Sequence, residues 1–471
     1  MKKIAILPGT GRGTMRSMVE GASRTHTGSL AERPLHRLRR FPSPFRGGLL
    51  TLAALLSTPA LAETVAFTGG TIAIGDGSQP IQNGTVVIAN GRVVAAGAGV
   101  AVPAGARVVD ATGKWVSPGI VTANTDIGIA DAYGIQETND ARAKDSPFSA
   151  ALDLSTAINE SGPAIANDRM TGVTRAFVVP VAGSTIFGGQ GAVIDLGADL
   201  DPVTRPRAFQ YVELGEDSTD RAGSRPAAQA MIRAALNAAR DPAQATLVTK
   251  DAIITKQDAA ALRPVVEGRM PLFVHANRVA DIRAALALKA EFPAVKMVLV
   301  GAAEGWRMAP QIAAANVPVI ATALADLPSK FEQLSATQSN VGRLVQAGVT
   351  VAISTVDGSE GPYNSYLTQY AGNLVALTKV PGASGLNWGA AFATITSKPA
   401  QTIGMDGEIG SLRPGRRADV VVWDGDPLEL SSEAVAVYID GIAQPMTSRQ
   451  TRLRQRYLDP REGSLPKAYQ H

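Results

Sequence analysis

Few side chains in this chain could perform acid–base or metal chemistry, and the scarcest type is histidine. The sequence has four histidines: His26 and His36 near its start, His471 at its end, and His275 between them. His275 ends the apolar run PLFVHAN, so we predict that it lies at the end of a buried strand. There it could act as a general base, bind a substrate or ligate a metal. The competing interpretation is a structural histidine, hydrogen-bonded at the end of the strand and without a role in chemistry.

Two aspartates are the other catalytic candidates. Asp126 ends a strand-like segment two residues after Asn124, and alternate residues of a strand point to the same side. Asp126 could ligate a metal, act as a base if burial raises its pKa, or cap the following turn. Asp357 lies in STVDGSEG, where Asp-Gly indicates a turn before it indicates catalysis. We therefore predict catalytic roles for Asp126, His275 and Asp357.

The metal chemistry open to this chain is restricted by composition. There is no cysteine, which excludes thiolate ligands and disulfides. Because His275 is the one histidine between the two ends, a site of three or four histidines is excluded from the middle of the chain. Asn124, Asp126 and Asp357 around His275 could hold one Mg²⁺, Mn²⁺ or Ca²⁺ ion. The predicted metal ligands are Asn124, Asp126 and His275, and a protein without metal is the alternative.

Two blocks rich in β-branched residues flank a long stretch in which apolar runs alternate with alanine-rich runs. This alternation is typical of βα units on a parallel sheet. The dipeptides Asn83-Gly84 and Asn90-Gly91 indicate hairpins in the first block. Strands are expected at 119–122, 176–180, 272–275, 296–300, 317–321 and 350–354. Helices are expected at 227–239, 279–291, 306–315 and 389–395. The register of residues 181–245 stays open.

Two other features have competing interpretations. Glu304 could line the mouth of a barrel or cap a helix that begins near Trp306, and capping is slightly favoured. The glycine-rich run Phe187 to Gly191 could let a ligand approach the backbone, but a tight loop is the more common use of such glycines.

The first 62 residues differ from the rest in charge. The whole chain has 45 basic and 41 acidic residues; residues 1–62 hold ten of the basic and two of the acidic ones, so the remainder is mildly acidic. This distribution argues against nucleic-acid binding. A basic region, the apolar run GGLLTLAALLSTPALA and the site Ala60-Leu61-Ala62 are typical of a secretory signal peptide. We expect cleavage near Ala62 and a periplasmic or secreted protein; a buried N-terminal helix is the alternative.

Several motifs resemble the amidohydrolase superfamily, in its branch related to imidazolonepropionase. They are GKWVSPGIVTA, GVTRAFVVP, VHANRVADIRAALALKAEF and SKPAQTIGMDGEIGSLRPGRRADVVVWDGDP, and the resemblance covers residues 63–444. It implies an α/β fold, a (β/α)8 TIM-like barrel with a composite β-sandwich built from both chain ends. The implied regions are a leader (1–62), sandwich (63–115), barrel (116–404), sandwich (405–450) and tail (451–471).

The resemblance also implies one or two divalent metals at the carboxyl ends of the barrel strands. The family's usual ligands are His-x-His on the first strand, a carboxylated lysine or a glutamate near the fourth, histidines on the fifth and sixth, and an aspartate on the eighth. In this chain the first-strand pair corresponds to Asn124 and Asp126, and Lys250 is the candidate near the fourth strand. The fifth-, sixth- and eighth-strand positions correspond to His275, Gly301 and Val356, and Asp357 follows the eighth-strand position by one residue. The resemblance therefore implies a degenerate metal site.

The family relationship implies a hydrolase of carbon–nitrogen bonds in cyclic amides, amidines, dipeptides or similar small molecules. The first hypothesis is an exported hydrolase of this kind with an atypical metal site. The alternative is a catalytically inactive barrel that binds a ligand or a protein partner. A self-assembling structural subunit is a third possibility, since such barrels are often oligomers. The expected partner is a small molecule, with no nucleic acid and no membrane span in the mature chain, and a homo-oligomer is possible.

Overall fold

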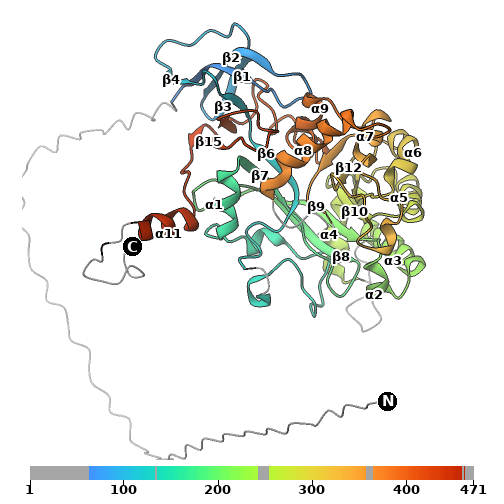
Figure 1. Cartoon of the computed structure of the whole chain (residues 1–471). Coiled ribbons are helices and arrows are strands. Elements are labelled where there is room, and N and C mark those ends of the chain that lie inside the picture. Colours follow the sequence, from blue (N-terminus) through green and yellow to red (C-terminus); the bar gives the residue numbers. More distant parts are fainter. Residues whose placement is uncertain (1–62, 133–134, 242–253, 357–363, 459–460, 462–471) are drawn as a thin grey trace, which may run out of the picture. The chain divides into compact units, whose positions relative to one another are not determined.

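The computed structural model describes residues 63–132, 135–241, 254–356, 364–458 and 461 (Figure 1). Contacts divide the chain into two units, and every described residue lies in the second, Pro59–His471. The predicted signal peptide, Lys250 and Asp357 lie outside the described residues. The described part contains two eight-stranded sheets.

The first sheet joins both ends of the described chain. Its order is β16-β15-β14-β5-β1-β2-β3, with β4 paired to β1. The strands are β1 (Val65–Ile72), β2 (Ile81–Ala89), β3 (Arg92–Gly97), β4 (Arg107–Asp110), β5 (Trp115–Pro118), β14 (Val420–Trp423), β15 (Ala434–Ile439) and β16 (Ile442–Ala443). The two ends meet where β5 pairs antiparallel with β14. The prediction of a composite β-domain is confirmed.

Only one of the two predicted hairpin turns is present. Asn90 and Gly91 both have positive φ, 52° and 70°, and connect β2 to β3 as a tight hairpin requires. Asn83 also has positive φ, 51°, but lies inside β2 where the pairing with β1 shifts register. The turn prediction at Asn83-Gly84 is therefore wrong, because this dipeptide forms a bulge.

The second sheet forms the barrel, in the order β13-β12-β11-β10-β9-β8-β7-β6. Its strands are β6 (Ile120–Thr125), β7 (Val173–Val178), β8 (Phe187–Asp195), β9 (Val203–Glu213), β10 (Leu272–Ala276), β11 (Met297–Gly301), β12 (Val319–Ala321) and β13 (Val351–Ile353). All six predicted strand segments overlap a strand of this sheet. The barrel nearly closes where the Asn124 backbone N–H donates to Ser354 Oγ at 3.0 Å. The predicted α/β barrel is confirmed.

One strand departs from a uniform succession of βα units. β8 runs antiparallel to both β7 and β9, whereas the other neighbouring pairs are parallel. β8 contains the glycine-rich run that was expected to form a loop, so that expectation is wrong. A Cβ at Gly191 would lie 2.2 Å from the Phe209 ring, so glycine allows the aromatic ring of β9 to pack against β8.

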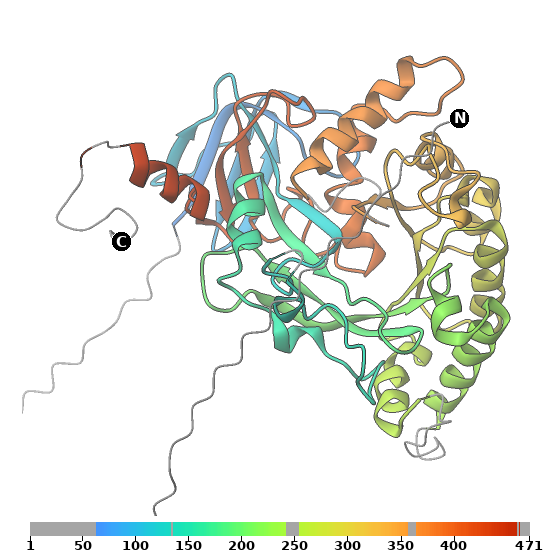
Figure 2. The same cartoon turned by 60° about the horizontal axis from the view of Figure 1, so that its bottom comes forward.

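Helices lie along the outside of the barrel strands (Figures 1 and 2). They are α1 (Pro163–Met170), α2 (Ser218–Ala222), α3 (Arg225–Arg240), α4 (Lys256–Val266), α5 (Val279–Glu291), α6 (Ala309–Ala314), α7 (Asn340–Gln346), α8 (Leu367–Ala376), α9 (Trp388–Ala393) and α10 (Ser397–Thr402), with α11 (Arg449–Leu458) near the C-terminus. The segment expected at 306–315 is divided into a 3-10 turn and α6, because Pro310 starts a new helix. Among the described residues, none of the helices is long and apolar enough to cross a membrane.

A buried ion cluster connects the barrel to the composite sheet. Arg175, on β7, is almost fully enclosed and pairs with Asp419 at 2.8 Å, Asp440 at 2.9 Å and Asp195 at 3.4 Å. Asp419 and Asp440 come from the C-terminal part of the sheet. Burial alone lowers the pKa of Arg175, but the three carboxylates reverse this effect and raise it. The guanidinium therefore holds two layers of the fold together as a permanent cation.

Candidate functional site

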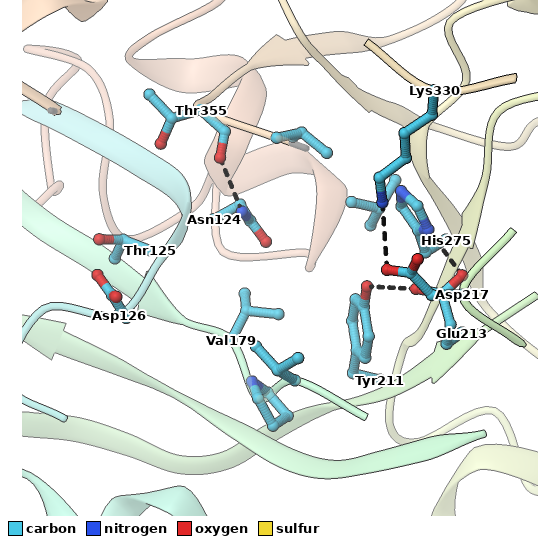
Figure 3. A pocket seen from close by; sticks show the side chains of 14 residues that line it. Asn124, Thr125, Asp126, Val179, Tyr211, Glu213, Asp217, His275, Lys330 and Thr355 are labelled. Carbon is cyan, nitrogen blue, oxygen red and sulfur yellow. Dashed lines mark hydrogen bonds and ion pairs between the residues drawn. The ribbon is translucent and has the colours of Figure 1, made fainter. Parts of the chain in front are cut away.

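A pocket of about 390 Å³ opens at the carboxyl ends of the barrel strands (Figure 3). Its lining comes from strands β6, β9, β10 and β11 and from the segments that follow β7, β12 and β13. The polar lining residues are Asn124, Thr125, Asp126, Tyr211, Glu213, Asp217, His275, Lys330 and Thr355. This is the end of a barrel at which side chains from separate strands converge.

The structure brings three of the four predicted site residues to this pocket. Asn124, Asp126 and His275 all line it, and so does Val356. Asn124 Nδ2 donates to the Thr355 carbonyl at 3.0 Å, which holds the amide at the junction of β6 and β13. In Figure 3, Asp126 lies across the pocket from His275. The two residues therefore share the cavity but belong to different groups of side chains.

His275 is paired with a carboxylate that the sequence did not single out, Glu213. The two residues are register partners on β10 and β9, and both are buried. Nδ1 of His275 lies 2.8 Å from Oε1 of Glu213, which also accepts the Gly215 backbone N–H at 2.7 Å. A carboxylate at Nδ1 places the proton of a neutral imidazole there. Nε2 is then the unprotonated ring nitrogen, and it lies 3.4 Å from Asn277 Nδ2.

Asn277 fills the space in which the family resemblance expects a sixth-strand histidine. Its Nδ2 lies 3.4 Å from Nε2 of His275, and its Oδ1 accepts the Ala303 backbone N–H at 3.1 Å. A Cβ at Gly301 would lie 2.4 Å from Asn277 Oδ1 and 3.2 Å from His275 Nε2. Gly301 also has a φ of 88°, which favours glycine. A histidine at position 301 would therefore require Asn277 to move and would strain the backbone.

Glu332 supports this arrangement from behind. Its side chain is fully buried; it accepts Asn277 Nδ2 at 2.9 Å and the Glu216 backbone N–H, and lies 3.7 Å from Arg225. Burial raises the pKa of Glu332, while the charge of His275 and these hydrogen bonds act in the opposite direction. Glu332 thus holds Asn277, and Asn277 in turn lies against the imidazole.

A lysine brings positive charge into the pocket. Lys330 lies between β12 and α7, two residues before the buried Glu332. Its Nζ is 3.1 Å from Asp217 Oδ2, and its side chain is 28% exposed. Figure 3 shows Lys330 reaching toward Asp217 on the same side of the pocket as His275. Among the described lining residues it is the one lysine or arginine.

A further carboxylate lies outside the pocket lining and interacts with Asp126. Asp168, on α1, is partly buried, feels the charge of Asp126 and accepts Asn364 Nδ2 at 3.0 Å. Burial raises the pKa of Asp168 to about 6; the Asn364 hydrogen bond lowers it and the charge of Asp126 raises it further. Asn364 also accepts from Thr122 Oγ1 at 2.8 Å, so this group is anchored on β6.

The described side chains do not fit the metal site that the resemblance implies. Both oxygens of Glu213 have protein partners: His275 and Gly215 on one, and Tyr211 at 3.4 Å on the other. Throughout the described ranges, no three His, Cys, Asp or Glu side chains gather in a way that could hold a metal. Because Asp357 lies outside these ranges, the oxygen-rich site of Asn124, Asp126 and Asp357 with His275 stays a prediction.

Sequence reasoning missed Glu213, Asn277, Lys330 and Glu332. For Glu213 a signal existed, since YVELG ends an apolar strand with a glutamate and the family allows glutamate near the fourth strand. Glu304 does not cap the segment near Trp306. Its Oε2 accepts the Val279 N–H at 3.0 Å and so caps α5, while Asn340 Oδ1 accepts the Trp306 N–H. The chain fold brings these partners together, and sequence spacing did not indicate it.

Comparison with known proteins agrees with this architecture. A model of the amidohydrolase family matches residues 277–442. The amidohydrolase tasK of Hapsidospora irregularis is 24% identical over 383 residues, which are 73% of this chain and 38% of that protein. An imidazolonepropionase of Maricaulis maris (strain MCS10) is 32% identical over 158 residues, 33% of this chain and 36% of that protein. The chain thus spans well under half the length of these relatives.

Solved structures show the same fold. A crystal structure of an amidohydrolase from Thermotoga maritima MSB8 has a TM-score of 0.69 and 24% identity, covering 80% of this chain and 99% of that one. An adenosine deaminase from Xanthomonas campestris, solved with bound zinc, has a TM-score of 0.51 and 16% identity over 84% of this chain and 98% of that one. Together with the barrel and the composite sheet, these matches show an amidohydrolase-like fold, and the family model and the curated relatives support a place in the amidohydrolase superfamily.

Proposed function

We propose that this protein hydrolyses a carbon–nitrogen bond of a small molecule, with His275 as the general base. The observation that carries the proposal is the buried Glu213–His275 pair at the carboxyl end of the barrel. A carboxylate that orients an imidazole and stabilises its protonated form is a recurring arrangement for proton transfer.

The reaction can be written with these side chains alone. Nε2 of His275 takes a proton from water as the water oxygen bonds to the carbonyl carbon. The carbon–nitrogen bond then breaks, and the same proton passes to the leaving nitrogen. Lys330 supplies positive charge near the developing oxyanion, and Glu213 stabilises the imidazolium. The products are a carboxylic acid and an amine, so the water is fully accounted for.

The proposal also includes export, an atypical metal site and a small-molecule substrate. Export is supported by the charge asymmetry and apolar run of residues 1–62. An atypical divalent-metal site is supported by Asp126 and Asn124 in the pocket and by the family's usual use of such metals. The small pocket favours a small-molecule substrate.

The test is hydrolysis of lactams, hydantoins, N-acyl amino acids and dipeptides by protein purified without chelator or histidine tag, with metal measured by elemental mass spectrometry. We expect turnover that His275→Gln lowers at least ~100-fold, as expected for loss of a general base. Glu291→Gln, an exposed substitution on α5, is the control and should leave the rate unchanged. Equal rates in wild type and His275→Gln would contradict the proposal.

Metal content separates the two forms of the site. If turnover survives EDTA, His275 and Lys330 perform the chemistry without a metal. If one equivalent of metal is present and Asp126→Ala removes it together with activity, the predicted oxygen-rich site is supported instead.

The second candidate is a barrel that binds a ligand without turning it over. The observation in its favour is the replacement of the first-strand and sixth-strand histidines by Asn124, Asp126 and Gly301. This candidate predicts no hydrolysis of the compound panel, together with saturable binding that Lys330→Met and His275→Gln weaken. Calorimetry with the same compounds measures it.

A further inference from the structure

A second cavity, about 740 Å³ in volume, lies outside the barrel mouth. It is bounded by α1, the start of α8, the loop after β14 and the start of α11. Its lining residues are Asn167, Met170, Thr171, Ser365, Tyr366, Thr368, Gln369, Trp423, Glu429, Leu430, Ser432, Glu433, Ala434, Val435, Met446, Ser448 and Gln450. We refer to this set as the α1–α8 groove.

The α1–α8 groove is apolar and acidic. Leu430 is 78% exposed and Val435 44% exposed at its edge, whereas Trp423 is buried beneath it. Glu429 and Glu433 line it, and its described lining includes no lysine or arginine. Exposed apolar side chains beside uncompensated carboxylates suit a partner that is itself apolar and basic.

The chain carries a segment with these properties, the helix α11. Its sequence RQTRLRQRYL has four arginines and no acidic residue, and none of its residues is buried. At 100° per residue, Arg449, Arg452, Leu453, Arg456 and Tyr457 share one side of the helix. Tyr457 is 57% exposed. Arg454 lies outside this stripe.

In its own chain α11 does not fill the groove. Ser448 and Gln450 line one edge of the groove, so the helix begins there. Both views show it extending away from α1 and β15 (Figures 1 and 2). Arg449, Arg452 and Tyr457 of the stripe are exposed, and Leu453 and Arg456 are partly exposed, so the stripe can contact another molecule that carries the same groove.

We propose that the α1–α8 groove binds α11 of a second copy of this chain. Leu453 and Tyr457 would enter beside Leu430 and Val435, and the arginines of the stripe would pair with Glu429 and Glu433. Because each copy has a groove and a helix that starts at its edge, the exchange is reciprocal. The result is a two-fold dimer with two identical contacts.

The test exchanges charges in the full chain and measures molar mass by light scattering. Glu429→Arg with Glu433→Arg gives one variant, and Arg449→Glu with Arg452→Glu and Arg456→Glu gives the other. Each alone should dissociate at least ~10-fold more readily than wild type, because its helix and groove then carry the same sign of charge. Mixed together, they should form a heterodimer, since both contacts again join opposite charges.

Arg454→Glu is the matched control and should leave dimerisation unchanged. A wild-type chain that is monomeric at tens of micromolar would overturn the proposal, as would failure of the mixed variants to associate while each remains folded by circular dichroism. Binding of wild type to vesicles of anionic lipid that requires the α11 arginines but not Glu429 or Glu433 would assign the helix to a membrane surface instead.

Discussion

Oε1 of Glu213 lies 2.8 Å from Nδ1 of His275, on two adjacent parallel strands that place both residues at the same level of the barrel. The pairing is a consequence of strand register, because Glu213 and His275 are direct partners across β9 and β10. As long as this register is kept, the two side chains stay together. This pair, rather than a cluster of histidines, defines the centre of the site.

Substitution of Glu213 by glutamine should lower kcat about 10- to 1000-fold with little change in KM. The amide keeps the size of the side chain but cannot stabilise an imidazolium. It also allows the neutral imidazole to carry its proton on either Nδ1 or Nε2. Steady-state kinetics on a substrate found in the panel measures the effect. A larger rise in KM than fall in kcat would instead indicate a substrate contact.

Introducing the family's histidine at position 301 should damage the fold rather than restore a metal site. In Gly301→His the new Cβ would lie 2.4 Å from Asn277 Oδ1, and the histidine would have to adopt a positive φ. We therefore expect a loss of about 1–3 kcal/mol in unfolding free energy. Gly407→Ala is the control, since a Cβ there meets nothing within 4 Å. Urea titration followed by circular dichroism compares the two, and equal midpoints would contradict the prediction.

Asp168 should make stability depend on pH on the acidic side of neutrality. Its pKa is about 6 in the folded protein against an ordinary value of 3.8, so the folded state holds the proton more tightly. The stabilising effect of that proton is complete below pH 4, is lost as pH rises from about 4 to 6, and stays lost above. Asp168→Asn should remove this slope and raise stability at pH 8 by about 1–3 kcal/mol. Melting curves from pH 4 to 8 for both proteins check it; parallel curves would sink the assignment.

Removing the buried cation should cost more than removing any surface charge. Arg175→Met leaves Asp195 and Asp419 buried without their partner, so we expect a loss of about 3–5 kcal/mol. Arg263→Met, in an exposed ion pair with Glu267, should change stability by less than about 1 kcal/mol. Chemical denaturation gives both values, and similar midpoints for the two variants would show that the cluster contributes little.

The sequence was sufficient for the barrel because its strands are continuous apolar runs separated by helices of ordinary length. It was also sufficient for His275, which ends such a run. The sequence did not reveal β8, because its glycines, which permit close packing of the strands, are also typical of loops. Glu332 and Lys330 could not be found either. They reach the site through a loop whose position depends on Asn277 and Asp217, residues 55 and 113 positions away in sequence.

The pairing of β5 with β14 has a consequence for the order of events during synthesis. Val116 is the register partner of Val422, more than three hundred residues later, so the edge of β5 that faces away from β1 has no partner until nearly all of the chain has left the ribosome. The carboxylates of Asp419 and Asp440 reach Arg175 at the same late stage. For most of its translation a nascent chain of this protein therefore exposes an open strand and an interior cation that has only Asp195 of its three carboxylate partners, which is the period when chaperones would recognise it.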